Sequence, residues 1–178
     1  MLVVTGLARS GTSLMMQILK ANGLGIVTDG RRKADEHNPK GYFEIENIGK
    51  KLEEDPNRYN DKKGCVKVLS LFITDLKKSS KKHTYIFMER ELGEIFASME
   101  KMSGEPMWKE LREHFIKYLE FTKELLEDEH AVCINYNNLI ENPEEELEHL
   151  KKVIPEMDIE KSKEVIDREL YRNKEVKE

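Results

Sequence analysis

The sequence predicts an α/β fold, a three-layer αβα sandwich with a central parallel sheet of about four to five strands, in a single domain over residues 1–178. Short apolar runs rich in β-forming residues alternate along the chain with longer segments whose apolar residues recur at helical spacing. Strands and helices that alternate in this way form a parallel sheet covered by helices on both faces. No linker rich in Pro, Gly or Ser divides the chain, and its 178 residues are enough to bury one core.

The first half of the chain begins with a β-rich run at 2–5, which leads through a glycine-bounded loop into a helix expected at 12–22. No periodic pattern follows, so the segment up to about residue 43 is expected to be irregular. Asn38-Pro39 and Gly41 indicate a turn, after which Tyr42 and Phe43 can anchor the segment against the core. A helix is then expected at 44–53, a strand at 65–69 and a helix near 71–78.

The second half continues the alternation. We expect strands at 84–88 and 131–135, and helices at 91–102, about 106–127, about 143–153 and 159–171. The long helix carries an apolar stripe made of Trp108, Leu111, Phe115, Ile116 and Leu119. Because one helix stripe has to cover the sheet, we expect this stripe to lie in the core, with a dimer face as the alternative.

Composition excludes several classes of function. The formal net charge of −5 gives no basic footprint, so nucleic acid is a poor partner, and the cationic runs 31–33 and 77–82 are expected to be solvated faces. No stretch approaches eighteen consecutive apolar residues, and the first strand begins at residue 2. We therefore expect no membrane anchor or signal peptide, and a cytoplasmic location.

The cysteines and histidines do not predict a metal site. Cys65 and Cys133 lie in apolar β-like runs without metal-type spacing, so both are expected to be reduced, buried thiols. The histidines are scattered, without an HExxH pattern or a carboxylate at a fixed offset. The sequence therefore predicts no metal and no redox chemistry.

The loop after the first strand has the layout of a phosphate cradle, and reads GxxxxGTS from Gly6 to Ser13. Gly6 permits a sharp turn, Gly11 lets backbone N–H groups approach an anion, and Thr12 and Ser13 place hydroxyls at a helix N-terminus. This is the frame of a P-loop, but the lysine that a nucleoside triphosphatase needs is replaced by Thr12. The bland alternative is a tight turn that binds no ligand.

The cation lies instead within the loop, at Arg9, and the run Arg9-Ser10-Gly11-Thr12-Ser13 resembles the 5′-phosphosulfate loop of sulfotransferases that use 3′-phosphoadenosine 5′-phosphosulfate (PAPS). Arg90 at a strand end and Ser98 on the next helix resemble the element that binds the donor's 3′-phosphate in that family. Taken alone, Arg90 would pair with Glu91 or Glu94 at the surface, and Ser98 would be an ordinary helix residue.

Two further segments follow in the order expected for sulfotransferases. The stretch 37–48, HNPKGYFEIENI, resembles the Asn-Pro-x-Gly-Tyr-Phe-Glu stretch of bacterial and archaeal sulfotransferase-like proteins. The stretch 131–154, which begins AVCINYNNLIENP, resembles their late strand, Tyr-x-x-Leu and Asn-Pro-led helix, and is expected to be structural. The chain is thus similar over residues 1–154 to a short form of the PAPS-dependent sulfotransferases.

The resemblance implies a P-loop-type fold, PAPS as sulfuryl donor without a metal, and a hydroxyl or amine of a small-molecule or carbohydrate acceptor. It implies donor binding by Arg9, Ser10, Gly11, Thr12, Ser13, Arg90 and Ser98. Arg9 and Lys67 would assist the leaving group. Glu44 is the first choice of general base and His37 the second, with helix capping or a first-turn dipole contact as the alternative role of Glu44.

The chain departs from the family in three places. It is short, which leaves few walls for a large acceptor. The strand CVKVLSL offers Lys67, Leu69 and Ser70 where cytosolic members often have a catalytic histidine. The C-terminal Arg-Lys-Gly element that helps to hold the 3′-phosphate in the family is matched only weakly here, by Tyr171-Arg172-Asn173-Lys174.

Two other classes of function stay open. A P-loop kinase or nucleotide hydrolase could use Arg9 in place of lysine and Mg²⁺ held by Ser13, although no strand ends in an Asp suited to that ion and Asp75 lies a helix turn beyond its strand. A non-catalytic nucleotide-binding protein on the same fold is the other alternative. Acceptor specificity is expected to come from 24–43 and 100–118, and the sequence does not fix the oligomeric state.

Overall fold

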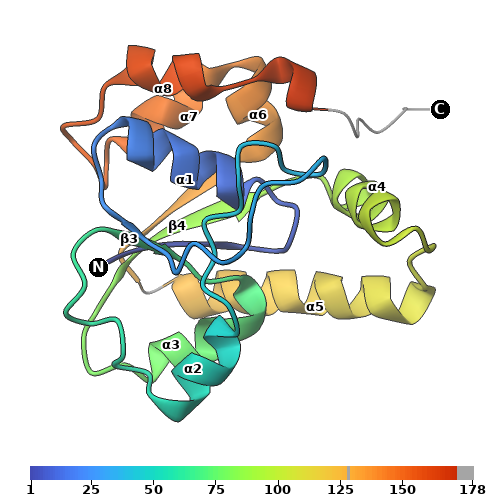
Figure 1. Ribbon diagram of the computed structural model, residues 1–178, viewed down its shortest axis with the longest axis horizontal. Coiled ribbons are helices and arrows are strands. Elements are labelled where there is room, and N and C mark those ends of the chain that lie inside the picture. The colour runs from blue at the N-terminus through green and yellow to red at the C-terminus, as the bar shows by residue number, and fades with distance from the viewer. Residues whose placement is uncertain (128, 172–178) are drawn as a thin grey trace.

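A computed structural model describes residues 1–127 and 129–171 of the chain (Figure 1). The strands are β1 (Leu2–Gly6), β2 (Ile26–Val27), β3 (Cys65–Lys67), β4 (Thr84–Glu89) and β5 (Ala131–Asn135). The α-helices are α1 (Thr12–Ala21), α2 (Ile48–Glu54), α3 (Ile73–Lys77), α4 (Leu92–Ser103), α5 (Lys109–Leu126), α6 (Tyr136–Glu141), α7 (Pro143–Leu150) and α8 (Ile159–Val165). Two short 3₁₀ turns, η1 (Ser70–Phe72) and η2 (Arg168–Leu170), complete the elements of these residues.

Within the described residues the strands form one parallel sheet in the order β2-β3-β1-β4-β5. β1 lies in the middle, with Val4 opposite Lys67 of β3 and Gly6 opposite Met88 of β4. The chain therefore runs outward from β1 to β2, returns to β3, and crosses to the other side of β1 for β4. Because all strands run the same way, the segments that follow β1, β3 and β4 emerge at one edge of the sheet.

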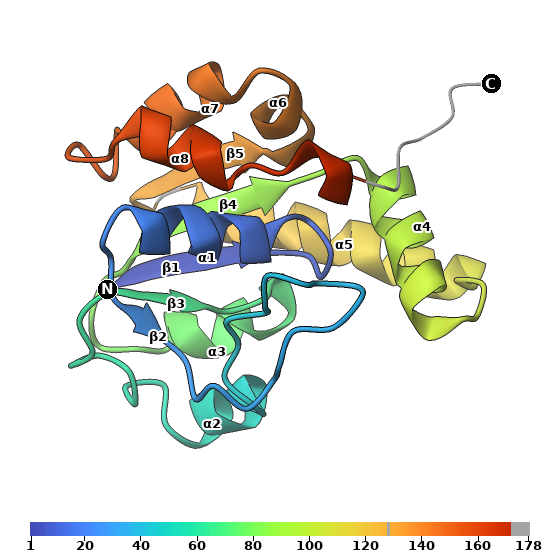
Figure 2. The ribbon, with the colours of Figure 1, turned by 45° about the horizontal axis from the view of Figure 1, so that its top comes forward.

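Helices cover both faces of the sheet, which confirms the three-layer α/β prediction. α1, α6, α7 and α8 lie on one face, and α2, α3 and α5 lie on the other, while α4 lies beyond the end of β4 (Figures 1 and 2). The strands of the sheet centre are apolar on both faces because both faces are buried. One core cluster lies between the sheet and α1, α6 and α7, and a second lies between the sheet and α2, α3 and α5.

Several elements differ from the sequence prediction. The helix expected from residue 44 begins only at Ile48, because Phe43 and Asn47 adopt left-handed backbone conformations with φ of 54°. The helix expected to reach 171 ends at Val165, since Ile166 is extended. β2 lies in the segment expected to be irregular, where two residues pair with β3. α6 was not predicted at all.

The long helix α5 only partly confirms its expected role in the core. Leu119 and Phe115 are half-buried and pack against core clusters. Trp108, Leu111 and Ile116 are exposed, so the prediction that the whole stripe is buried was wrong. The reason is the length of α5. Its N-terminal end extends past the sheet toward α4, where there is less structure for its apolar side chains to pack against (Figure 1).

Both cysteines are free thiols, as predicted, but the prediction that both are buried is correct for Cys65 only. Cys65 is buried in β3, whereas Cys133 is exposed on β5, where exposed and buried residues alternate along the strand. The Cys133 thiol donates to Glu89 Oε2 at 3.1 Å. In the described part of the chain, no helix combines the length and the apolar character needed to cross a membrane.

His83 precedes β4 and makes stability depend on pH. Its side chain is 4% exposed, and neither ring nitrogen has a hydrogen-bond partner among the described residues. Burial lowers the pKa of this imidazole, so the folded state holds it neutral. Below the ordinary pKa of about 6.5, the unfolded chain binds more protons at this position than the folded chain does.

We therefore expect the free energy of unfolding to fall as pH drops below about 6.5, where an unfolded histidine takes up its proton. His83→Leu should flatten this dependence, because the substitution removes the buried titrating group. Urea unfolding between pH 5 and pH 8, at intervals of about half a unit, measures it. The exposed His114→Gln is the matched control, and an unchanged slope in His83→Leu would contradict the prediction.

Candidate functional site

The loop between β1 and α1 is held in a turn that few residues can adopt. Gly6, Arg9 and Gly11 have φ of 146°, 71° and 96°. A Cβ at Gly6 would lie 2.6 Å from the carbonyl oxygen of Met88 in the adjacent strand, and one at Gly11 would lie 2.2 Å from the Tyr136 ring. Both glycines are therefore required by close approach as well as by backbone conformation.

α1 begins at Thr12 directly after this loop, and its N-cap residue, Gly11, makes no side-chain cap to the first turn. The first N–H groups of a helix have no acceptor within the helix, and the helix dipole favours negative charge there. The start of α1 therefore has backbone donors of the kind that bind a phosphate or sulfate group, and the phosphate cradle stays a prediction.

A cavity of about 190 Å³ opens beside the loop, at the edge of the sheet where β1, β3 and β4 end. Nearly all the predicted site residues line it, namely Arg9, Gly11, Thr12, Ser13, His37, Glu44, Lys67, Arg90 and Ser98. Ser10 does not. Its hydroxyl is buried under the loop and has no hydrogen-bond partner within the described residues. The fold thus brings together residues that lie up to 89 positions apart.

Ser98 is a hydrogen-bond partner of the loop arginine. The Arg9 Nε donates to Ser98 Oγ at 2.8 Å, and Arg9 Nη2 donates to the His37 carbonyl oxygen at 3.2 Å. Arg9 is thereby fixed against α4, through Ser98, and against the segment 28–43, through His37. Arg90 and Ser98, predicted to act together, do line the same cavity.

Arg90 is tied into the protein on several sides. Its Nε lies 2.9 Å from Glu94 Oε2, and its Nη1 donates to the Arg9 carbonyl oxygen at 3.0 Å. The guanidinium also lies over the Tyr136 ring, 4.6 Å from the ring centroid. The alternative in which Arg90 pairs with Glu94 is therefore correct about the partner, but the pair is buried rather than at the surface, since the two side chains are 7% and 4% exposed.

Lys67 places a buried ammonium group beside the start of α1. Its side chain is 3% exposed, and its Nζ lies 2.7 Å from Glu44 Oε1, 3.1 Å from the Tyr42 carbonyl oxygen and 3.1 Å from Ser13 Oγ. Burial lowers the pKa of Lys67, while the carboxylate of Glu44 opposes this shift. The ammonium thus supplies positive charge next to a hydroxyl at the start of α1.

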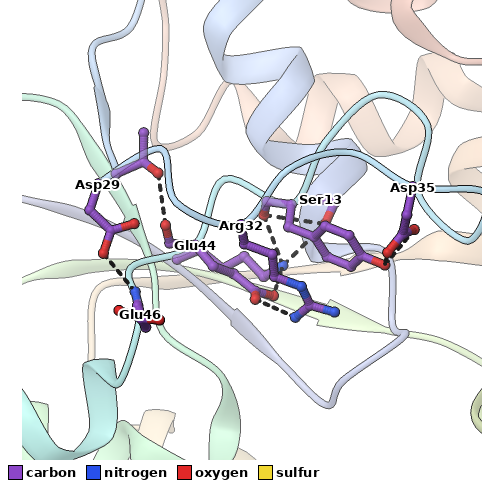
Figure 3. A network of polar contacts seen from close by, with 9 residues as sticks. Ser13, Asp29, Arg32, Asp35, Glu44 and Glu46 are labelled. Carbon is purple, nitrogen blue, oxygen red and sulfur yellow. Dashed lines mark hydrogen bonds and ion pairs between the residues drawn. The ribbon is translucent and has the colours of Figure 1, made fainter. Parts of the chain in front are cut away.

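Glu44 bridges two cations. Its second oxygen, Oε2, lies 2.5 Å from Nη1 of Arg32, and Figure 3 shows these two side chains facing each other beside Ser13. Burial by itself would raise the pKa of Glu44, but Lys67 and Arg32 outweigh it and hold that pKa below its usual range. The side chain lies in the irregular segment before α2, so the expectation that Glu44 starts a helix was wrong.

The segment 28–43 crosses the cavity and is held by its own polar contacts. The Tyr42 hydroxyl donates to the Asp35 carboxylate at 2.8 Å, and that carboxylate also accepts from the backbone N–H groups of His37 and Asn38. Gly41 N donates to the Asn38 carbonyl oxygen at 3.0 Å, which closes the predicted turn. Tyr42 is buried, as expected, and Phe43 packs against the core.

Arg32 and Tyr136 are among the residues of the cavity wall that were not predicted as site residues. Arg32 belongs to the cationic run expected to be a solvated face, yet its guanidinium lies 3.5 Å from the Tyr42 ring centroid and pairs with Glu44. Tyr136 belongs to a stretch expected to be structural, yet its ring lines the cavity over Gly11. The position of Tyr136 directly after β5 was a usable signal, because ligands bind beyond the carboxyl ends of parallel strands.

Two remaining predictions concern metal binding and the C-terminal stretch 171–174. Among the described residues, no group of three or more His, Cys, Asp or Glu side chains could hold a metal ion. Arg172, Asn173 and Lys174 of the C-terminal stretch lie outside the described residues. Tyr171 is buried, and its hydroxyl donates to Glu94 Oε1 at 2.6 Å.

Removing Glu44 leaves the Lys67 ammonium buried without its carboxylate. Because breaking a buried ion pair on one side is costly, we expect Glu44→Ala to lower the free energy of unfolding by about 3 kcal/mol. The double variant Glu44→Ala with Lys67→Met should regain most of this loss, since no charge stays buried. Urea unfolding of the two variants and the wild type measures both effects.

The exposed pair Lys81 and Asp61 provides the control, and Asp61→Ala should leave stability unchanged because surface pairs contribute little. A double variant no more stable than Glu44→Ala would contradict the assignment of the loss to the stranded ammonium.

Comparison with known proteins supports the fold. No family model matches the chain, and no curated protein matches it. The solved structure of an unliganded sugar kinase from Janibacter sp. HTCC2649 is similar over 90% of this chain and 96% of that chain, with a TM-score of 0.52 and 14% sequence identity. A likeness at this identity supports the α/β fold with its all-parallel sheet, and it carries no assignment of activity.

Proposed function

We propose that the chain transfers a sulfuryl group from PAPS to a hydroxyl or amine of a small-molecule or carbohydrate acceptor and releases adenosine 3′,5′-bisphosphate. The observation that carries the proposal is the Lys67 ammonium at 3.1 Å from Ser13 Oγ. In P-loops that bind nucleoside triphosphates, the hydroxyl at this place holds Mg²⁺. Here a cation of the protein occupies the neighbourhood of that hydroxyl, which suits a transfer assisted by fixed protein charges.

The donor would lie along the loop with its 5′-phosphosulfate on the first N–H groups of α1. Arg9 and the hydroxyls of Thr12 and Ser13 border that position. The 3′-phosphate would lie toward Arg90 and Ser98, which line the same cavity. Each charge-assisted hydrogen bond there contributes about 1.5–3 kcal/mol, enough to select PAPS over nucleotides that lack this phosphate.

In the reaction, a bond forms between the acceptor oxygen or nitrogen and sulfur as the bond from sulfur to the bridging phosphate oxygen breaks. By analogy with phosphoryl transfer, the transition state is loose and negative charge develops on the departing oxygen. Arg9 and Lys67, which line the cavity, would stabilise that charge. Preorganised donors are most effective in a site shielded from water. The electron pair leaves with the bisphosphate, and the acceptor proton goes to a base.

His37 fits the role of base better than Glu44. Each Glu44 oxygen already accepts from a cation, and its lowered pKa makes the carboxylate a weak proton acceptor. The His37 side chain is partly exposed and lines the cavity. Glu44 then holds Lys67 in place, while His37 takes the acceptor proton.

The second candidate is phosphoryl transfer from ATP, which the sugar kinase of similar fold suggests. In that case Arg9 would replace the P-loop lysine, and Mg²⁺ would have to bind at Ser13 in competition with Lys67. A protein that binds a nucleotide at this loop without catalysis would use the same residues for the nucleotide and none for an acceptor.

Calorimetry with adenosine 3′,5′-bisphosphate and with ATP plus magnesium separates these candidates. We expect the wild type to prefer the bisphosphate, and Arg9→Ala and Arg90→Ala each to weaken it at least tenfold, since a charge-assisted bond contributes about 1.5–3 kcal/mol. Lys81→Ala, which removes an exposed cation far from the cavity, is the control for net charge.

Preference for ATP with magnesium, unchanged by Arg90→Ala, would overturn the sulfotransferase proposal in favour of a kinase. Tight bisphosphate binding without sulfate transfer to any member of a broad acceptor panel would favour the non-catalytic protein.

Once an acceptor is in hand, His37→Asn tests the base. We expect kcat for sulfate transfer to fall by about 10²–10⁴, because a general base contributes this much, while bisphosphate affinity stays near that of the wild type. Steady-state kinetics together with calorimetry measure the two quantities. The exposed His114→Gln is the control, and an unchanged kcat in His37→Asn would return the role to Glu44.

A further inference from the structure

We propose that Glu94 is a positioning residue, which with Tyr171 fixes Arg90 so that this arginine both shapes the phosphate-binding loop and faces the nucleotide. The inference rests on the proposed function only for the identity of the nucleotide. Glu94 does not line the cavity, and its effect on a ligand would pass through Arg90.

Glu94 is a buried carboxylate held at both oxygens. It lies in the first turn of α4 and is 3% exposed. Its Oε2 is 2.9 Å from Arg90 Nε, and its Oε1 accepts from the Tyr171 hydroxyl at 2.6 Å. Two partners on opposite oxygens fix the carboxylate plane, and a planar guanidinium aligned to it has little rotational freedom left.

The end of the Arg90 guanidinium away from Glu94 contacts the loop between β1 and α1. Its Nη1 donates to the carbonyl oxygen of Arg9, a residue with φ of 71°, where a non-glycine side chain is unfavourable. The bond from Arg90 therefore helps to hold the loop in this conformation. The Tyr136 ring lies under the guanidinium at 4.6 Å and limits its movement in the remaining direction.

Tyr171 brings the C-terminal segment into this arrangement. Its hydroxyl accepts from Asn137 Nδ2 at 2.7 Å while it donates to Glu94. Burial and the neighbouring carboxylate raise the pKa of Tyr171 to about 12, so the hydroxyl stays a donor throughout the neutral range. Asn137 of α6 thus binds the Tyr171 hydroxyl, and Tyr171, directly after η2, binds the Glu94 carboxylate of α4. The other oxygen of that carboxylate holds Arg90.

A buried ion pair by itself says little about purpose, because such pairs are often neutral for stability. Here the arginine of the pair lines the cavity and contacts the loop backbone. A positioning role and a purely structural role therefore differ in a measurable way. If Glu94 positions Arg90, its substitution changes how well the protein discriminates between nucleotides. If its role is purely structural, the substitution changes the stability of the fold.

The experiment compares binding of three probes, adenosine 3′,5′-bisphosphate, ATP with magnesium, and adenosine 5′-monophosphate, to the full chain. For each variant, the readout is the affinity for the nucleotide that the wild type prefers, divided by the affinity for the monophosphate. Glu94→Gln keeps an acceptor for Tyr171 but turns its amide group toward Arg90. We expect this ratio to fall about tenfold, the loss expected of a hydrogen bond between charged groups.

Two further variants make the result specific. Tyr171→Phe should lower the ratio in the same direction by a smaller factor, and it decides the question if Glu94→Gln does not fold. Adding Glu94→Gln to Arg90→Ala should cause no further fall, because Glu94 acts through Arg90. Glu100→Gln, which removes another α4 carboxylate and its pair with Arg112, should leave the ratio unchanged.

Other outcomes overturn the inference. A ratio that rises in Glu94→Gln would mean that the carboxylate only repels the phosphates. Equal, additive losses in the presence and absence of Arg90, together with lower thermal stability, would mean a structural role. The wild-type preference is read separately, so a preference for ATP would remove the sulfotransferase proposal while the same ratio still tests Glu94.

Discussion

The position of β1 between β3 and β4 is the constraint on which the whole site depends. The register sets Val4 beside Lys67 and Gly6 beside Met88, so the loop after β1 has a cation from β3 on one side and Arg90, directly after β4, on the other. The turn needs Gly6 because the carbonyl oxygen of Met88 leaves no room for a Cβ. The site is thus built by the backbone of the sheet, and the side chains fill places that strand order has already fixed.

Four cations that line the cavity each have a partner inside the protein. Lys67 and Arg32 share Glu44, Arg90 is paired with Glu94, and Arg9 uses a hydroxyl and a backbone carbonyl. A buried cation without such partners would be costly. Arg9 differs from the other three cations because both of these partners are neutral, and it lies within the loop itself. An anionic ligand would gain most from Arg9, where it displaces a hydroxyl or a carbonyl oxygen rather than a carboxylate.

The fold was predictable because parallel strands buried on both faces are nearly continuous apolar runs, as in 2–5 and 84–88. The loop and the cavity residues that follow β1, β3 and β4 were predictable for a related reason, since strand ends in a parallel sheet meet at one edge. The start of α2 was not, because left-handed residues at Phe43 and Asn47 have no strong local signal. Nor was the contact between Arg9 and Ser98, which depends on how α4 packs 89 residues away.

A shared fold does not determine which reaction a protein catalyses. The reaction depends on individual side chains and ions at the site. The sugar kinase with a similar fold and this chain share only 14% of their aligned residues, so few side chains can be compared between them. What bears on the chemistry here is the group beside the Ser13 hydroxyl. An ammonium there brings its charge with the protein, whereas a magnesium ion would have to arrive with the nucleotide. Under the proposed function, a donor whose transfer needs no metal bridge would suit this loop better than a nucleoside triphosphate would.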